Sequence, residues 1–168
     1  MSRKCGAIPL GLLGAAVVFA IYAEMRHDDR EPDGPDNTGV LIALNNEMIR
    51  AHVCGDIAGA ERTARKILSQ PVWRTFVPAN AVMGSVLAQK GEYAAAAAFF
   101  KAALSGRGPA APQPVVMNDY ADTLRHLGRY AEAEAFARRA VAASGGKVPL
   151  FRQTLDQILN EADKRPSS

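Results

Sequence analysis

The segment NDYADTLRHLGRYAEAEAFARRAVAAS, residues 118–144, decides the fold of this chain. Tyr120, Leu124 and Leu127 recur at the spacing of one helix face, which predicts an amphipathic helix that ends near Gly128. Glycine adopts without steric cost the left-handed conformation that often ends a helix, so the chain can turn there. The segment therefore predicts a helical hairpin. The apolar face of its second helix consists of Ala133, Phe136, Ala137, Ala140 and Val141.

The same pattern occurs three times along the chain. Its turn glycines, Gly55, Gly91 and Gly128, are separated by 36 and then 37 residues. Counted from each glycine, position +2 is a large apolar residue, position +5 is an alanine and position +13 is another large apolar residue. A period of this length predicts stacked helical hairpins. The three sets are Ile57, Tyr93 and Tyr130; Ala60, Ala96 and Ala133; and Leu68, Leu104 and Val141.

This pattern resembles the tetratricopeptide repeat family over roughly residues 41–147. The resemblance is strongest at 114–147, good at 77–110 and weaker at 41–75, where Met48 replaces a small residue and Ala64 stands where the next repeat has Phe100. It implies an all-α fold, an α-solenoid of about three helix-turn-helix hairpins. We place the extra residues of the period in the connection 105–114, whose Gly and Pro residues cannot continue a helix.

Residues 148–163 predict a capping helix after the last hairpin. One apolar stripe follows its length, while Arg152, Gln153, Asp156 and Gln157 lie mostly away from it. A helix with one apolar and one polar face can cover the open end of a repeat stack. A docking helix for a partner is the alternative, and residues 164–168 predict an unstructured tail. The stripe consists of Leu150, Phe151, Thr154, Leu155, Ile158 and Leu159.

Residues 1–23 predict a membrane-targeting segment. Arg3 and Lys4 precede an uncharged run over residues 5–23, which as a helix would rise roughly 28 Å, close to the ~30 Å of a bilayer core. We expect an uncleaved signal-anchor, with the repeats outside the cytoplasm. A signal peptide cut near Ala20 or Ala23, which would give a secreted or periplasmic protein, is the alternative, and a buried soluble helix is the third. Residues 24–39, charged and rich in Pro and Gly, predict a flexible linker to a repeat domain at 40–163.

Composition and charge limit the classes of function that the chain can have. The chain of 168 residues is long enough for one domain and a terminal segment, and its alanine-rich helices suit close stacking. Its 20 Lys and Arg against 17 Asp and Glu give a net charge of only +3, which offers little support for nucleic-acid binding. No spacing typical of a catalytic or metal site is present. His52 and His126 both lie near the ends of first helices, and neither belongs to an HExxH pattern. The sequence therefore predicts a noncatalytic protein without a cofactor or metal.

The family resemblance implies a concave wall, formed by the first helix of each hairpin, that holds a partner protein or an extended peptide. We expect an adaptor or accessory subunit of an envelope assembly, secretion or maturation complex, anchored in the membrane through residues 5–23. The alternative is a secreted periplasmic protein that self-associates as a structural module or acts as a chaperone for exported proteins. The residues that the resemblance places on the wall are Asn45, Ile49, His52, Ser85, Gln89, Asn118, Asp122 and Arg125.

Overall fold

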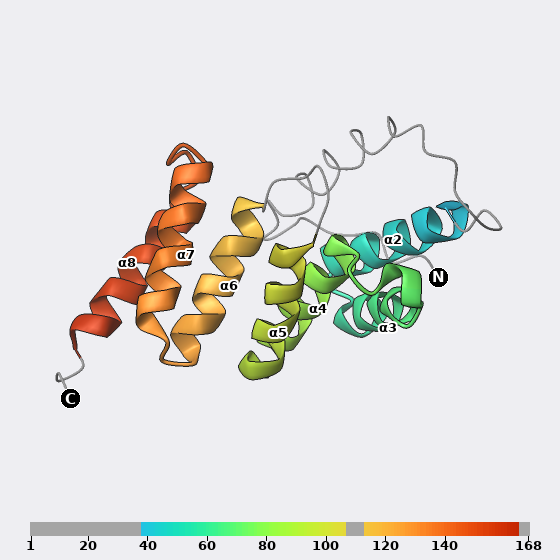
Figure 1. Ribbon diagram of the computed structural model, residues 1–168, viewed down its shortest axis with the longest axis horizontal. Helices are drawn as coiled ribbons and strands as arrows, with labels where there is room; N and C mark the ends of the chain where they lie inside the picture. Colours follow the sequence, from blue (N-terminus) through green and yellow to red (C-terminus); the bar gives the residue numbers. More distant parts are fainter. Residues whose placement is uncertain (1–37, 107–112, 165–168) are drawn as a thin grey trace. The chain divides into compact units, whose positions relative to one another are not determined.

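The computed structural model describes residues 38–106 and 113–164 (Figure 1). Within these ranges the chain forms seven α-helices and one short 3₁₀-helix, which confirms the predicted all-α class. The first of these helices begins at Thr38, so the last two residues of the predicted linker belong to it. The predicted membrane segment, the rest of the linker and the tail after residue 164 lie outside the described residues.

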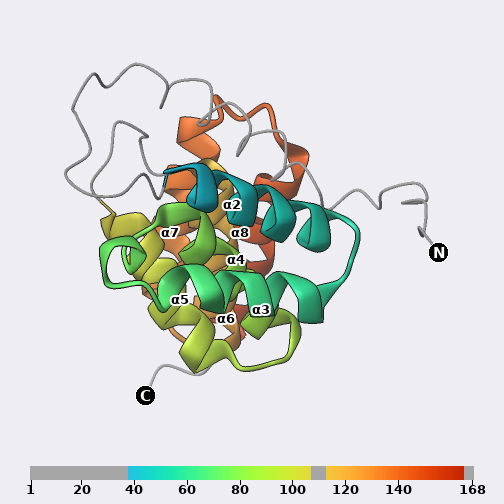
Figure 2. The same ribbon diagram turned by 90° about the vertical axis from the view of Figure 1, so that its right-hand side faces the viewer.

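The chain divides into two compact units, and the boundary falls inside α4 (Val77–Gln89), between Met83 and Gly84. In the first unit, α2 (Thr38–Val53) and α3 (Ile57–Leu68) pack against each other as a hairpin. Figures 1 and 2 both show these two helices side by side. The 3₁₀-helix η2 (Pro71–Trp73) follows and contacts α3 before α4 begins.

The second unit continues after the boundary with four helices. They are α5 (Tyr93–Ser105), α6 (Pro114–His126), α7 (Tyr130–Ala143) and α8 (Pro149–Asp163). From α5 onward each helix packs on the next in the sequence, and α8 also contacts α6. This sequential packing is typical of stacked helical hairpins, in which each unit contacts only its neighbours.

The three predicted turn glycines share one backbone geometry. Gly55, Gly91 and Gly128 have φ of 73°, 77° and 73°, the left-handed region that glycine adopts without strain. The amide after each glycine donates to a carbonyl five residues earlier, as in a Schellman motif, and so satisfies a carbonyl at the end of the preceding helix. These bonds run from Asp56 to Ala51, from Glu92 to Leu87 and from Arg129 to Leu124, each at 2.9 Å.

Helix packing in the second unit depends on a glycine inside α4. A Cβ atom on Gly84 would lie 2.7 Å from two ring carbons of Phe100, so the ring of α5 occupies the space of a missing side chain. The first hairpin has the opposite arrangement, since Met48 on α2 and Ala64 on α3 are both fully buried. The large residue thus lies on the first helix in one repeat and on the second helix in the other. This explains how the repeat at 41–75, which fits the family pattern less well, still forms a hairpin.

The C-terminal helix α8 covers the end of the second unit. Phe151, Thr154 and Ile158 are buried, and Phe151 packs with Met117 of α6 and Ala140 of α7 in one apolar cluster. The buried stripe is narrower than predicted, because Leu150 at the start of the helix is 42% exposed. The contacts of α8 with both α6 and α7 are those of a capping helix, as predicted.

Candidate partner-binding face

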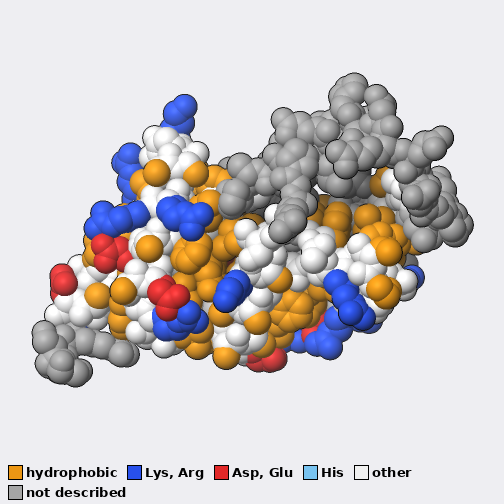
Figure 3. Space-filling model, in the orientation of Figure 1, with side chains coloured by type: hydrophobic (Ala, Val, Ile, Leu, Met, Phe, Trp, Pro, Cys, Tyr) orange, Lys and Arg blue, Asp and Glu red, His pale blue; other side chains and the backbone are white. Residues whose placement is uncertain are grey.

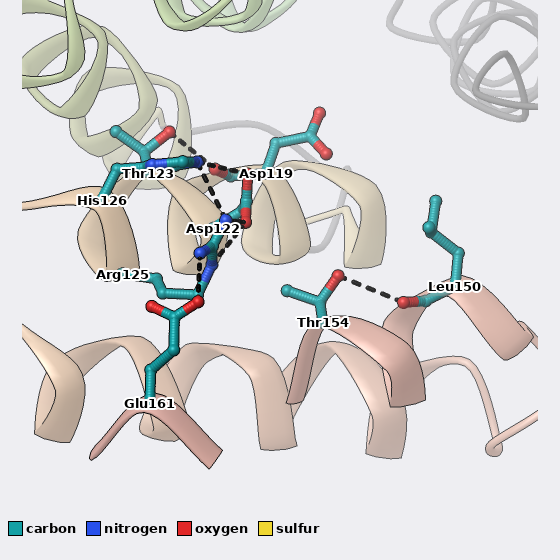
Figure 4. Close-up of polar contacts among 8 residues, drawn as sticks. All are labelled: Asp119, Asp122, Thr123, Arg125, His126, Leu150, Thr154 and Glu161. Carbon is teal, nitrogen blue, oxygen red and sulfur yellow. Dashed lines mark hydrogen bonds and ion pairs between the residues drawn. The ribbon is translucent and has the colours of Figure 1, made fainter. Parts of the chain in front are cut away.

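Helix α6 carries three of the predicted wall residues on one face. Asn118, Asp122 and Arg125 are spaced by four and three residues, so their side chains emerge on the same side of the helix. Arg125 donates from Nε and Nη2 to Oδ1 of Asp122, at 2.9 and 2.8 Å (Figure 4). We refer to Asn118, Asp122 and Arg125 as the α6 face.

The Arg125 side chain also joins α6 to the capping helix. Its Nη1 atom donates to Oε1 of Glu161 on α8 at 2.7 Å, and only 15% of the side chain is exposed. Burial alone would lower the pKa of Arg125, but hydrogen bonds and charges from Asp122 and Glu161 raise it above its ordinary value. Arg125 therefore stays charged, with two carboxylates of its own chain as partners.

A ring stack that the sequence did not indicate lies beside this pair. The rings of Tyr93 on α5 and His126 on α6 are 4.2 Å apart at 5°, in parallel stacking. Nε2 of His126 lies 2.9 Å from Nη2 of Arg125 and 3.7 Å from Oδ2 of Asp122. Because a guanidinium can only donate, Nε2 of His126 is the acceptor in its contact with Arg125.

Asn118 contributes a buried acceptor to the α6 face. The residue is only 4% exposed, yet its Oδ1 atom has no hydrogen-bond partner among the described residues. The side chain hydrogen-bonds the neighbouring Asp119, whose carboxylate points away from Arg125 in Figure 4. Burial raises the pKa of Asp119 to about 6, only partly offset by the Asn118 hydrogen bond. Buried acceptors are rarely left unpaired, so Oδ1 of Asn118 lacks a donor that the described residues do not supply.

The remaining predicted wall residues form two further local groups. Asn45, Ile49 and His52 share one face of α2 in the first unit, with the two side-chain polar atoms of Asn45 and Nδ1 of His52 buried and unpaired in the described chain. Burial lowers the pKa of His52 below its ordinary value. On α4, Nε2 of Gln89 donates to Oγ of Ser85 at 3.4 Å, and Gln89 is exposed. A buried amide oxygen without a partner in the described chain thus occurs at corresponding places on α2 and α6.

The surface around α7 and α8 carries charges of both signs. Figure 3 shows Lys and Arg side chains beside Asp and Glu, with apolar atoms between them. Within residues 38–106 and 113–164, no group of three or more His, Cys, Asp or Glu side chains is placed to hold a metal ion. The helices of these same ranges are all too short or too polar to cross a bilayer.

Comparison with protein families gives one match. A family model described as tetratricopeptide repeat matches residues 55–113 and 114–148, which together make up more than half of the chain. The chain belongs to the tetratricopeptide repeat family. The second matched segment contains the α6–α7 hairpin, whereas the first begins at Gly55, after α2. No curated protein and no solved structure gave a significant match. Tetratricopeptide repeats are typically noncatalytic, and they generally serve as scaffolds for protein–protein interaction.

Proposed function

We propose that this tetratricopeptide repeat protein is a noncatalytic scaffold that binds an extended segment of a partner protein on the α6 face. The buried and unpaired Oδ1 atom of Asn118 is the observation that carries the proposal. A buried acceptor without a partner costs about 1–3 kcal/mol, a cost that a main-chain N–H of a bound segment would remove once the Asn118 side chain turns toward it. Asp122, whose side chain is 43% exposed, offers further acceptors one helical turn away.

The surroundings of Arg125 support an internal peptide segment as the ligand, rather than a free C-terminal carboxylate. Its guanidinium already has Asp122 and Glu161 as partners, and little of it is exposed. A third carboxylate would have to displace one of them. Main-chain N–H groups, in contrast, match the acceptors of Asn118 and Asp122 without disturbing Arg125.

The cellular setting that we propose is the outer side of a cytoplasmic membrane. The uncharged run over residues 5–23 supports an anchor, and the polar segment 24–37 supports a spacer between the anchor and the repeats. In this setting the protein would act as an adaptor or accessory subunit of an envelope assembly, secretion or maturation complex. A secreted protein that self-associates, or a chaperone for exported proteins, is the competing proposal.

The α6 face is tested by replacing both Asn118 and Asp122 with Ala in the full-length chain. Arg125 is left in place because it also holds α8. The matched control replaces Gln153 and Asp156, an exposed amide and carboxylate on α8, with Ala. We expect crosslinked partner recovered from native membranes to fall roughly tenfold in the first variant and to stay unchanged in the control. Unchanged recovery with native helicity in the first variant would contradict the proposed face.

The membrane setting is tested on the same recovered protein by mass analysis of its amino terminus. We expect an intact amino terminus in the membrane fraction, together with a crosslinked partner. A chain that begins near Ile21 or Glu24 and is recovered from the soluble fraction as a self-crosslinked species would favour the secreted structural module instead.

A further inference from the structure

A groove lies between α5 and α7 in the second unit, with α6 beneath it. Its volume is about 520 Å³, within the range of ligand-binding pockets. Tyr120 is the residue of α6 that lines it. At 100° per residue, Tyr120 lies roughly 160° around the helix from both Asn118 and Asp122. The groove is therefore on the opposite side of α6 from the α6 face.

The walls of the groove differ in side-chain size. Half of the α5 residues in the lining are alanines, namely Ala94, Ala97 and Ala98, while α7 contributes the ring of Phe136. Phe136 packs edge-on against Tyr120, with their ring centroids 4.8 Å apart. Small residues opposite a pair of aromatic rings leave space for one large apolar side chain of a ligand.

The rim of the groove is positively charged. Its charged residues are three cations, Lys101, Arg129 and Arg139, and one carboxylate, Glu132, so the described lining has a net charge of +2. Arg129 donates to both carboxylate oxygens of Glu132, at 2.8 and 2.7 Å. The hydrogen bond from Arg129 lowers the pKa of Glu132 and the charge of Lys101 contributes to this shift, but no ion pair within 4 Å is found for Lys101 or Arg139 in the described residues. The Arg139 guanidinium lies 4.9 Å from the centroid of the Phe136 ring. Two cations are thus available to an anionic ligand.

We propose that this groove is a second binding site, for an acidic segment of a partner protein that carries one large apolar side chain. The apolar side chain packs on Tyr120, Phe136 and the alanines of α5, and neighbouring carboxylates pair with Lys101 and Arg139. Charge complementarity favours an acidic occupant. The small number of cations favours a peptide over a membrane surface, because clusters that bind anionic lipids usually hold four to eight Lys or Arg residues.

The probe is a short fluorescent peptide with Glu and Asp on both sides of one central Phe, titrated into the full-length chain in detergent. We expect saturable binding that weakens roughly tenfold or more in the double variant Lys101→Glu, Arg139→Glu. The matched control, Arg62→Glu with Lys66→Glu, reverses two exposed cations on α3 and should bind the probe as the unmodified chain does. Replacing Phe by Ala in the peptide should weaken binding to a similar extent.

A second variant, Ala98→Trp, fills the groove without changing its charge. We expect it to block the probe while circular dichroism shows native helicity. The pair Asn118→Ala, Asp122→Ala should leave probe binding unchanged, since it alters the other side of α6. This result separates the groove from the function proposed for the α6 face.

Several results would overturn the proposal. They are a lack of saturable binding, equal binding to the charge-reversed or Trp variant, and equal binding of the peptide without Phe. Vesicles with 30% phosphatidylserine that bind with the same dependence on Lys101 and Arg139 would assign the groove to a membrane surface. Residues 24–39 of this chain are acidic. If a peptide of this segment bound as tightly as the probe, the groove would be assigned to the chain's own segment.

Discussion

Gly84 lies so close to the ring of Phe100 that the helix has no room there for a side chain. We expect Gly84→Ala to lower the free energy of unfolding by about 1–3 kcal/mol, because the added methyl group overpacks the contact between α4 and α5. Phe100→Ala should cost about 3–5 kcal/mol by opening a cavity. Thermal unfolding of the full-length chain, followed by circular dichroism, measures both changes.

The double variant shows whether the two residues form one contact. The α6–α7 hairpin has Ala121 and Ala137 at the corresponding positions, both fully buried, so a hairpin of this kind can hold two alanines there. We expect the double variant to lose less stability than the two single variants added together, with a coupling of at least about 0.5 kcal/mol. Additive losses would mean that Gly84 is not required by the Phe100 ring.

The raised pKa of Asp119 predicts that the free energy of unfolding depends on pH. Its pKa is about 6 in the folded chain, against a value of 3.8 without the surrounding structure, so the folded state binds more protons between these two values. The free energy of unfolding should therefore fall as the pH rises from about 4 to about 6, and the loss should persist above that. Asp119→Asn removes this partly buried charge and should raise the free energy of unfolding at pH 7 by about 2 kcal/mol.

The comparison between the Asp119→Asn chain and the unmodified chain isolates this effect from other carboxylates. Denaturant unfolding at a series of pH values should give similar stabilities near pH 4 and a growing advantage for the variant up to pH 6. An advantage that is the same at every pH would show that the carboxyl group is not the cause.

At the scale of elements, Arg125 and Glu161, which are 36 residues apart in the sequence, form an ion pair that links α6 to α8. Glu161→Gln removes the charge of one partner while keeping its size. Because the glutamate is 39% exposed, we expect a modest loss of about 0.5–1 kcal/mol, concentrated in α8. Amide hydrogen exchange should show faster exchange along α8 than in the unmodified chain.

A matched control comes from a carboxylate that pairs within a single helix. Glu134 accepts from Arg138 on the same helix, α7, at 2.6 Å. Glu134→Gln should leave the exchange rates of α8 unchanged. If both variants affected α8 equally, or if neither did, the Arg125–Glu161 pair would not hold the cap in place.

The helices and turns could be predicted because their signals are local. Gly55, Gly91 and Gly128 end helices through their own backbone freedom, and all three have positive φ. Proline occupies the first turn of α6 and α8, where its missing N–H has no intrahelical partner. The contact of Glu161 with Arg125 could not be predicted in this way, since it depends on how α8 packs beside α6.

At the scale of the whole molecule, the sequence repeat indicates hairpins but not the limits of the compact units. The boundary between Met83 and Gly84 divides a helix that the repeat pattern treats as continuous. The groove between α5 and α7 could not be predicted from the sequence either, because it depends on how the helices pack. The alanines of α5 resemble ordinary helix-packing residues, and Lys101 and Arg139 are brought to one groove only because α5 and α7 lie on either side of α6.

Binding of a partner at the α6 face is the central claim, and site-specific photo-crosslinking tests it most directly. A photo-reactive residue is placed at the exposed position 126, one turn after Asp122 on α6, or, as a control on the exposed side of α8, at position 156 of the full-length chain, and native membranes are irradiated. We predict a defined partner adduct from position 126, lost when Asn118 and Asp122 are also changed to Ala, and no adduct from position 156. Adducts from position 156 alone, or an adduct from position 126 that does not depend on Asn118 and Asp122, would contradict the claim.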